Sequence, residues 1–311
     1  MKGRTVRYLD DGGLDIVEID VPDPGIGEVQ VQGGVCGICA WDLYTFRHGA
    51  KAPSAAPPGH EGLGYVVKVG PGVSGFREGD RVVGGGFQTL RNLKAERLYR
   101  LPESDLADEY WQVEPLSCVV TGVDHCHLRI GDRVAVVGCG YMGLLLVQCL
   151  ARSFADHVLA VDLVPWRLEL AKRFGAAKVL NPSQADDRAR LQELAGTYDC
   201  VVDASGAAGG MDASVTLVRR GGHLNIFGWV HGPVTIDGTK FHGGGYTAVW
   251  SSPTAAVRQV FPVAIQLIHR GQVDTASVVS HVVSLDELAD LLKGVTQGEI
   301  KNYLKGMVRL A

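Results

Sequence analysis

Apolar and polar residues alternate in several short runs of the first third of the chain, and glycine and proline separate these runs. The runs cover residues 14–19, 28–35, 64–69 and 81–83, and valine is common in them. Alternation with a period of two, carried by β-branched residues, is typical of strands. The pattern therefore predicts a β-rich region up to about residue 116.

From residue 132 the pattern changes to short apolar runs, and all but the last are followed by a segment with helical periodicity. The apolar runs cover residues 133–138, 157–162, 178–180, 200–205 and 223–228, and the helix-like segments cover 142–152, 165–176, 188–196 and 210–220. Such alternation builds a parallel sheet with helices on its faces. We therefore expect an α/β fold class, with a doubly wound parallel sheet after the β-rich region.

The remainder of the chain contains three further elements. Residues 248–250 read as a strand, and residues 255–270 read as an amphipathic helix in which Pro262 either causes a kink or marks the true start. Residues 278–295 read as a strand followed by a helix. There Ser284 is expected to be the N-cap, with Glu287 as its capping-box partner.

Composition limits the class of protein. The 311 residues suggest about two domains, and the net charge of −4 comes without a basic stripe, which argues against nucleic acid or a membrane surface as partner. The N-terminus lacks the apolar segment of a signal peptide, and no uninterrupted apolar run is long enough to span a membrane. Seven scattered cysteines make an odd number, so we expect reduced thiols and a cytoplasmic location.

A glycine motif follows directly on the apolar run at 133–137. Gly138, Gly140 and Gly143 form G-x-G-x-x-G at the start of a helix-like segment, and Asp162 ends the next apolar run 19 residues after Gly143. In this position the first glycine permits the turn, the second lets a pyrophosphate approach, and the third allows close helix packing. The carboxylate of Asp162 can accept hydrogen bonds from a ribose, so the motif predicts NAD rather than NADP.

Two metal-binding residue types stand in the β-rich region. Cys39 and His60 offer a thiolate and an imidazole, both good zinc ligands, and either Glu61 or Glu114 could add a carboxylate oxygen. A fourth position would then stay open for water or substrate, which is typical of a catalytic zinc site. The spacing alone leaves the choice of carboxylate open.

The chain resembles the zinc-containing medium-chain alcohol and polyol dehydrogenases over nearly its whole length. The resemblance rests on V-C-G-I-C-A-W-D at 35–42, G-H-E-G at 59–62, E-P-L at 114–116 and the glycine motif, together with K-V-G-P-G-V-S-G-F-R-E-G-D-R-V-V at 68–83. It implies a GroES-like catalytic domain formed by residues 1–116 and 248–311. A Rossmann domain that binds NAD, residues 117–247, would be inserted between these two parts.

The resemblance also implies roles for individual residues. Cys39, His60 and Glu114 would bind zinc in the manner of the polyol dehydrogenases, with Glu61 close enough to swing in, and Asp42 would take the free ring N–H of His60. Tyr44 would belong to the catalytic residues, and the cofactor would contact Gly138, Gly140, Tyr141, Met142, Gly143, Asp162, Arg167, Phe227 and Trp229. Cys36 is expected to line the wall of the site and not to act as a redox partner. Cys139 is expected to pack under the glycine turn, and His125 and His127 are expected to lie on a solvated surface.

Two departures from the family pattern change the expectation. The lobe of four closely spaced cysteines that holds a structural zinc in many relatives is absent, so we expect one zinc per chain. Trp41 occupies the usual place of the Ser or Thr that relays the substrate proton, and an indole cannot shuttle a proton. Tyr44, Glu61, His48 or water would then have to replace it.

These observations predict a zinc- and NAD-dependent dehydrogenase that interconverts a secondary alcohol and its ketone. Asp42, Tyr44 and His48 near the mouth favour a sugar, cyclitol or other polyhydroxylated substrate, whereas Trp41 and Trp229 would suit a flat ring. One alternative is an epimerase or lyase that uses bound NAD(H) or zinc on the same fold. The other is a cofactor-binding protein without turnover. The family usually forms homodimers or homotetramers through the edge of the Rossmann sheet.

Overall fold

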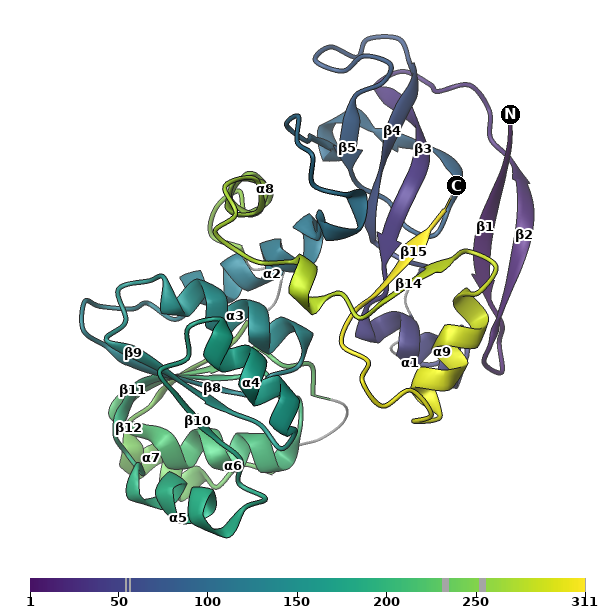
Figure 1. Cartoon of the computed structure of the whole chain (residues 1–311). Coiled ribbons are helices and arrows are strands. Elements are labelled where there is room, and N and C mark those ends of the chain that lie inside the picture. Colours follow the sequence, from purple (N-terminus) through teal and green to yellow (C-terminus); the bar gives the residue numbers. More distant parts are fainter. Residues whose placement is uncertain (54, 56, 231–234, 252–255, 311) are drawn as a thin grey trace. The chain divides into compact units, whose positions relative to one another are not determined.

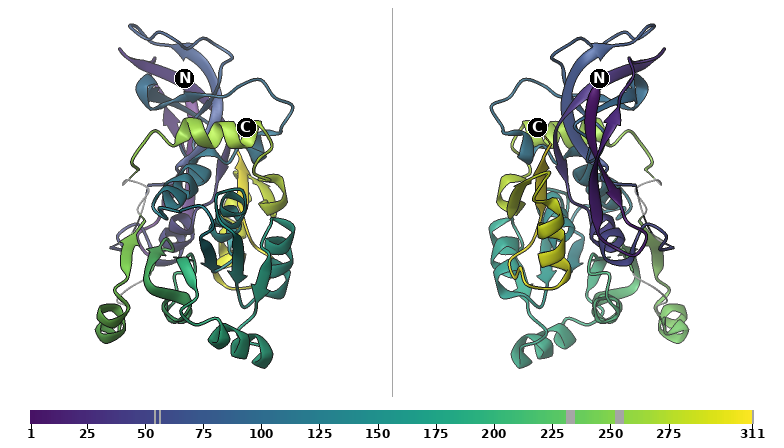
Figure 2. Two further views of the ribbon diagram at one scale, coloured as in Figure 1. Left: turned by 90° about the vertical axis from the view of Figure 1, so that its left-hand side faces the viewer. Right: turned by 90° about the vertical axis from the view of Figure 1, so that its right-hand side faces the viewer.

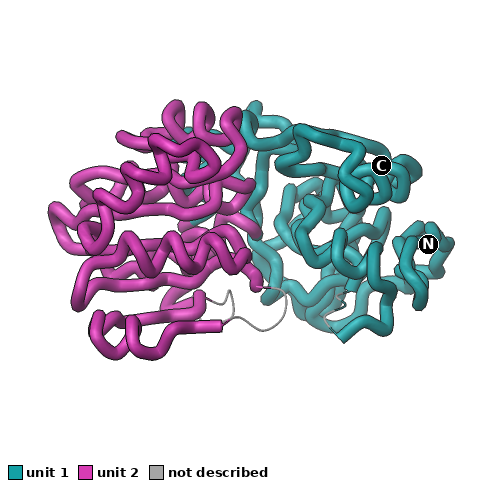
Figure 3. Tube along the Cα trace, turned by 90° about the horizontal axis from the view of Figure 1, so that it is seen from below, with its two compact units in different colours: residues 1–114, 264–311 teal, residues 115–263 magenta. Residues whose placement is uncertain are grey.

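The computed structural model describes residues 1–53, 55, 57–230, 235–251 and 256–310. The chain divides into two compact units, drawn in different colours in Figure 3. Unit 1 comprises Met1–Glu114 and Ala264–Ala311, and unit 2 comprises Pro115–Val263. Among the described residues, no helix is long and apolar enough to cross a membrane.

Unit 1 is built on a sheet of seven strands, in which a segment from the end of the chain pairs with one from its beginning. The order is β14-β15-β3-β4-β5-β7, and β6 pairs with β3 in addition. The bounds are β3 (Glu28–Gly37), β4 (Glu61–Val69), β5 (Arg81–Val83), β6 (Leu90–Lys94), β7 (Tyr99–Arg100), β14 (His281–Ser284) and β15 (Gly306–Arg309). The strands expected at 28–35, 64–69 and 81–83 are confirmed.

The remaining elements of unit 1 cover this sheet. Strands β1 (Lys2–Tyr8) and β2 (Leu14–Asp20) form a separate antiparallel ribbon, the purple pair in Figure 2. Helices α1 (Ala40–His48) and α9 (Leu288–Thr296) contribute apolar side chains to one core with β1, β3 and β15. Two short 3₁₀ helices, η1 (Ala95–Arg97) and η2 (Asp108–Tyr110), lie in the connections that follow β6 and β7. This core holds β3 and β15 side by side, which matters for the site described below.

Unit 2 contains a parallel sheet in the order β10-β9-β8-β11-β12-β13. Its strands are β8 (Arg133–Val137), β9 (His157–Val161), β10 (Lys178–Leu180), β11 (Tyr198–Asp203), β12 (Val218–Ile226) and β13 (Thr247–Trp250). The strand order reverses between β8 and β11, which is the Rossmann arrangement and puts the ligand crevice at the carboxyl end of β8. The expected doubly wound sheet is therefore confirmed.

Helices cover both faces of this sheet. Figure 1 shows α3 (Tyr141–Ala151) and α4 (Pro165–Arg173) on one face, and α5 (Ala185–Glu193) and α6 (Ala208–Leu217) on the other. The helix α7 (Gly238–Gly244) follows β12, and α2 (Val113–Asp124) spans the boundary between the two units. The helix expected at 210–220 ends earlier, at Leu217. Residues 218–220 instead begin β12, because the β-branched and fully buried Val218 pairs with Tyr198 of β11.

Two expectations for the end of the chain can be compared with the structure. Helix α8 (Phe261–His269) has Pro262 as its second residue, so this proline marks the start rather than a kink. Helix α9 begins at Leu288, later than expected, because Ser284 still belongs to β14 and a turn separates the two elements. The carboxylate of Glu287 reaches back to the backbone N–H and hydroxyl of Ser284, at 2.8 and 2.7 Å. Only the glutamate half of the expected capping box is therefore present.

Candidate metal centre and cofactor site

Strand pairing in unit 1 brings Cys39 and His60 together, although 20 residues separate them. Gly37 at the end of β3 lies opposite Glu61 at the start of β4, so the residues just beyond these two ends are neighbours. Cys39 then caps the N-terminus of α1, and its backbone N–H donates to the Asp42 carboxylate at 2.8 Å. The strand register and the helix start together fix the position of the thiol.

Cys39, His60 and Glu61 form a group that can bind a metal ion. One ligand atom from each residue lies within 4.8 Å of the other two. Ligand atoms around a tetrahedral zinc are about 3.5 Å apart, so small side-chain rotations would complete the set. A thiolate, an imidazole and a carboxylate are the donors that zinc prefers, and the group therefore fits this metal.

The thiol of Cys39 and the carboxylate of Asp42 are both strongly influenced by burial. Burial raises the pKa of Cys39 to about 12, and the charge of Glu61 acts in the same direction, while Lys305 opposes them. Asp42 is fully buried, and burial raises its pKa against the effect of the Cys39 N–H. A metal ion must therefore displace the Cys39 proton, which couples metal binding to pH.

Three hydrogen-bond donors hold the carboxylate of Asp42. Its carboxylate accepts from the Tyr8 hydroxyl at 2.9 Å, the Cys39 N–H at 2.8 Å and the Gly59 N–H at 3.1 Å. Of these donors only the Cys39 N–H reaches Oδ2, and the charge of His60 acts to lower the pKa of the Asp42 carboxyl, so the contact with the His60 ring N–H stays a prediction. Since the side chain is fully buried, Asp42 supports the backbone on both sides of the metal group and cannot line a substrate mouth.

A buried lysine completes the surroundings of the metal group. Lys305 is 2% exposed, forms an ion pair with Glu61 and donates to the carbonyl oxygen of Ile38 at 2.9 Å. Burial alone would lower the pKa of Lys305, but the charges of Glu61, Cys39 and Glu114 raise it overall. Glu114 is thus close enough to act on Lys305, although it lies outside the group of three.

Lys305 could not be recognised from the sequence, because it lies 244 positions after Glu61 and carries no local motif. Met307 in β15 pairs with Gly37 in β3, and this pairing places Lys305 beside the metal group. Tyr8 was missed for the same reason, since β1 contributes to the core next to α1. Both contacts depend on long-range strand packing.

Trp41, Tyr44 and His48 all lie on helix α1. Trp41 and Tyr44 are half-buried, and His48 is exposed in the last turn. The rings of Tyr44 and His48 are 4.4 Å apart between centroids, and Nδ1 of His48 lies 3.0 Å from the Tyr44 carbonyl oxygen. The two side chains therefore form a pair that is anchored within one turn of the helix.

The glycine motif in unit 2 has the geometry of a dinucleotide-binding turn. Gly138 has a φ of +95°, which a residue with a side chain rarely adopts. A Cβ at Gly143 would lie 1.9 Å from the Gly138 carbonyl oxygen, whereas a Cβ at Gly140 would meet nothing within 4 Å. The space above Gly140 is open, and the N-terminus of α3 follows immediately, so the turn fits a pyrophosphate.

Asp162 stands at the end of β9 beside this turn. Its Oδ2 accepts from the Cys139 N–H at 2.6 Å and its Oδ1 from the Val164 N–H at 2.8 Å. Each carboxylate oxygen has a second lone pair, so both can still accept from ribose hydroxyls. Arg167 lies near enough to act on the pKa of Cys139, which burial raises. Cys139 itself is fully buried under the turn, as expected.

The other residues expected near the cofactor also belong to unit 2. Tyr141 and Met142 open helix α3, and both are half-buried. Phe227 and Trp229 follow β12, and both are half-buried as well. A Cβ at Gly122 would lie 2.6 Å from the Phe227 ring, so this ring packs closely against α2.

Two further expectations concern thiols and histidines. None of the seven cysteines forms a disulfide, in agreement with the expectation of reduced thiols. His127 is exposed, but His125 is buried, with its Nδ1 3.0 Å from the Ser251 hydroxyl, which in turn donates to Asn225 at 2.7 Å. The expectation of a solvated surface at His125 is therefore wrong, because its ring belongs to a buried hydrogen-bond network with Ser251 and Asn225.

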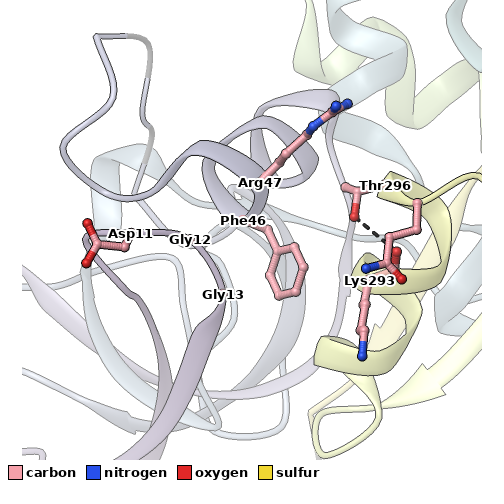
Figure 4. Close-up of a pocket in the computed structure, with 8 residues that line it drawn as sticks. Asp11, Gly12, Gly13, Phe46, Arg47, Lys293 and Thr296 are labelled. Carbon is pink, nitrogen blue, oxygen red and sulfur yellow. Dashed lines mark hydrogen bonds between the residues drawn. The ribbon is translucent and has the colours of Figure 1, made fainter.

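A separate hollow of about 550 Å³ lies in unit 1, at the C-terminal ends of α1 and α9 (Figure 4). It is lined by Asp11, Gly12, Gly13, Phe46, Arg47, Lys293, Thr296 and Gln297. Cys39 lies at the opposite end of α1, about 13 Å away by the rise of the helix. The hollow is therefore distinct from the metal group.

Comparison with known proteins agrees with this arrangement. Residues 25–103 match the alcohol dehydrogenase GroES-like domain, and residues 142–270 match the zinc-binding dehydrogenase model. An alcohol dehydrogenase of Moraxella sp. (strain TAE123) is 31% identical over 74% of this chain and 79% of its own length. D-arabinitol dehydrogenase 1 of Uromyces fabae is 28% identical over 90% of each chain.

A solved structure leads to the same family. The 2R,3R-butanediol dehydrogenase from Bacillus subtilis superimposes with a TM-score of 0.82 over 99% of both chains, at 26% identity. The GroES-like unit 1, the Rossmann sheet of unit 2 and these matches agree with one another. The chain belongs to the zinc-type medium-chain dehydrogenase family of oxidoreductases.

Proposed function

We propose that this oxidoreductase interconverts a secondary alcohol and its ketone, with NAD as the hydride acceptor and one catalytic zinc. The observation that carries the proposal is that two zinc donors, Cys39 and His60, converge beside the Glu61 carboxylate in a chain that also has an open dinucleotide turn at Gly140. When bound, zinc supplies Lewis-acid activation of the substrate hydroxyl, and nicotinamide supplies the hydride acceptor.

Cys39, His60 and Glu114 are proposed as the zinc ligands. Cys39 and His60 supply the soft and borderline donors, and Asp42 supports them by holding the backbone N–H groups of Cys39 and Gly59. Glu114 opens helix α2, and its charge acts on Lys305, as do those of Cys39 and Glu61. Glu61 is the neighbouring carboxylate, and it forms an ion pair with Lys305.

NAD is proposed as the cofactor, rather than NADP. Asp162 has unused lone pairs for the ribose hydroxyls, and its negative charge would repel a phosphate at the 2′-position. Gly140 leaves room for the pyrophosphate, and Tyr141 and Met142 follow at the helix start. Arg167, Phe227 and Trp229 are proposed to border the cofactor.

The substrate proton is proposed to leave through Tyr44 and water. Trp41 has no group that can pass on a proton, while the Tyr44 hydroxyl can both accept and donate. Tyr44 lies one helical turn after Ala40 and contacts the exposed His48, which gives a path toward solvent. Tyr44 therefore replaces the relay hydroxyl of the family.

A polyhydroxylated or ring-shaped alcohol is the proposed substrate class. Two of the similar proteins are named arabinitol and butanediol dehydrogenases, and both names describe alcohols with more than one hydroxyl group. Tyr44 and His48 offer polar contacts, and Trp41 offers a flat apolar face. Asp42 no longer supports this proposal, because it is fully buried.

The test is nicotinamide turnover at 340 nm over a panel of secondary alcohols and polyols, combined with zinc analysis. We expect NADH formation and about one zinc per chain. Cys39→Ala should lose the zinc, and its activity should fall at least about 10³-fold, since the metal stabilises the transition state by several kcal/mol. Cys149→Ala, which removes a free thiol on α3, is the matched control and should keep both. Full zinc content in Cys39→Ala would exclude the assigned centre.

We also propose a cytoplasmic homodimer or homotetramer. Seven cysteines that form no disulfide are suited to a reducing compartment. Strand β13 forms one edge of the sheet in unit 2, and its Trp250 is 53% exposed. An exposed aromatic side chain on an edge strand favours pairing with a second copy.

A further inference from the structure

The ion pair between Lys305 and Glu61 is the most deeply buried pair of opposite charges among the described residues. The side chain of Lys305 is 3% exposed and that of Glu61 is 4% exposed. A buried charge pair is costly to desolvate and is retained only where it has good geometry and further hydrogen bonds. Here the lysine also donates to the Ile38 carbonyl oxygen, directly before Cys39.

The backbone makes room for this pair. A Cβ at Gly37 would lie 2.1 Å from Oε2 of Glu61 and 3.1 Å from Cε of Lys305. Gly37 ends β3, Glu61 begins β4 and Lys305 directly precedes β15. They meet because β3 pairs with β4 on one side and with β15 on the other. The absence of a side chain at Gly37 thus allows the carboxylate and the ammonium to meet beside the metal group.

Charge balance indicates what the lysine does. The thiolate of Cys39 and the carboxylates of Glu61 and Glu114 would bring three negative charges to a doubly charged zinc ion. The Lys305 ammonium brings the total to zero, and its contact is with Glu61. Without that cation, the buried Glu61 carboxylate would have to turn to the metal or take up a proton, and a zinc ion close by favours the first.

We propose that Lys305 is a positioning residue that keeps the Glu61 carboxylate off the zinc ion at rest. The ligand set is then Cys39, His60 and Glu114, and the fourth position stays open for water or substrate. This inference rests on the proposed zinc centre and extends it by pairing Glu61 with Lys305 instead of with the metal. The C-terminal segment before β15 therefore determines the coordination number.

The test measures zinc affinity by competition with a chromophoric chelator, and the visible spectrum of the cobalt-substituted protein. Glu61→Gln should change the zinc dissociation constant by less than about threefold. Lys305→Met should release Glu61 to the metal, tighten zinc binding about tenfold and alter the cobalt spectrum. The double variant Lys305→Met/Glu61→Gln should restore the spectrum of the unaltered protein. Lys301→Met, in the exposed turn before β15, is the matched control and should change neither quantity.

Two results would overturn the inference: a loss of tenfold or more in zinc affinity for Glu61→Gln, or an unchanged cobalt spectrum in folded Lys305→Met. If Lys305→Met does not fold, Glu61→Gln and the double variant still decide the question, because neither leaves Glu61 as a buried unpaired anion. His60→Ala separates this inference from the proposed function. Retained zinc in that variant would exclude the metal centre itself, whatever the result at Lys305.

Discussion

At the scale of single residues, Asp162 combines a structural and a binding role. Its two oxygens fix the turn at Cys139 and the start of the segment at Val164. Each of these hydrogen bonds involves a charged acceptor and contributes about 1.5–3 kcal/mol. The same carboxylate remains available to a ribose. Changes at Asp162 are therefore expected to affect both the free energy of unfolding and the choice of cofactor.

For cofactor choice we expect kcat/KM with NAD to exceed that with NADP by at least about 10²-fold, because a partly desolvated carboxylate repels a 2′-phosphate by a few kcal/mol. The variant Asp162→Ser/Leu163→Arg should reverse the preference. Leu163→Arg alone is the control, since Leu163 is 64% exposed and the carboxylate is kept. Steady-state kinetics with both cofactors measure the ratio, and a preference for NADP in the unaltered protein would contradict the assignment.

The proton path can be tested at Tyr44. We expect Tyr44→Phe to lower the rate of alcohol oxidation about 10²-fold near neutral pH, the low end for losing a positioned proton-transfer group. The deficit should shrink as pH rises, because hydroxide then removes the proton directly. The measurement is kcat as a function of pH, with Tyr110→Phe as the matched control on another element.

Trp41→Ser gives the complementary result. It restores a relay hydroxyl and removes bulk, so activity on small alcohols should be kept or increased and the substrate range should widen. If Tyr44→Phe left kcat unchanged at every pH and Trp41→Ser abolished turnover, the indole would be required for substrate binding. Tyr44 would then not carry the proton.

At the scale of elements, the turn between β8 and α3 contains one glycine that is needed for folding and another that is needed for binding the cofactor. A Cβ at Gly143 would clash with the Gly138 carbonyl oxygen at 1.9 Å, but a Cβ at Gly140 would enter open space. Gly140 has a φ of −66°, which alanine also adopts. The two glycines thus serve different purposes in one motif.

We therefore expect Gly143→Ala to destabilise the protein by about 1–3 kcal/mol, the usual cost of overpacking. Gly140→Ala should leave the melting temperature unchanged and weaken NAD binding at least about tenfold, because its methyl group occupies the space of the pyrophosphate. Thermal unfolding and a fluorescence titration with NADH measure the two effects. If both variants kept the melting temperature and the NADH affinity of the unaltered protein, the motif would not be the dinucleotide site.

Elements with local signals could be predicted from the sequence, and elements defined by distant partners could not. The alternation in unit 2 predicted the Rossmann strands because each strand and helix carries its own periodicity. The early end of α6 was missed, since Val218 follows the helical pattern but pairs with β11. The delayed start of α9 was missed because the Ser284 and Glu287 signal is the same whether or not a turn intervenes.

At the scale of the whole molecule, unit 1 is assembled from both ends of the chain. Strand β15 joins the sheet beside β3, and this places Lys305 next to Glu61. The ligand candidates Cys39 and His60 could be found from the sequence because their residue types and flanking motifs are local. The cation that balances their charge could not be found in this way, because its position depends on strand order.

The edge of the sheet in unit 2 gives a last prediction about assembly. Among the described residues, β13 pairs only with β12, and Trp250 on this strand is 53% exposed. Pairing of two β13 edges in a dimer would bury this indole, which contributes up to about 3 kcal/mol per copy.

We expect the unaltered protein to be at least a dimer by light scattering, and Trp250→Glu to shift it toward monomers. The new carboxylates would face each other across the paired edges, where their repulsion and desolvation oppose association. Phe154→Glu is the matched control, because Phe154 is an aromatic side chain of unit 2 that is 69% exposed. A Trp250→Glu protein with unchanged mass in solution would place the subunit contact on another surface.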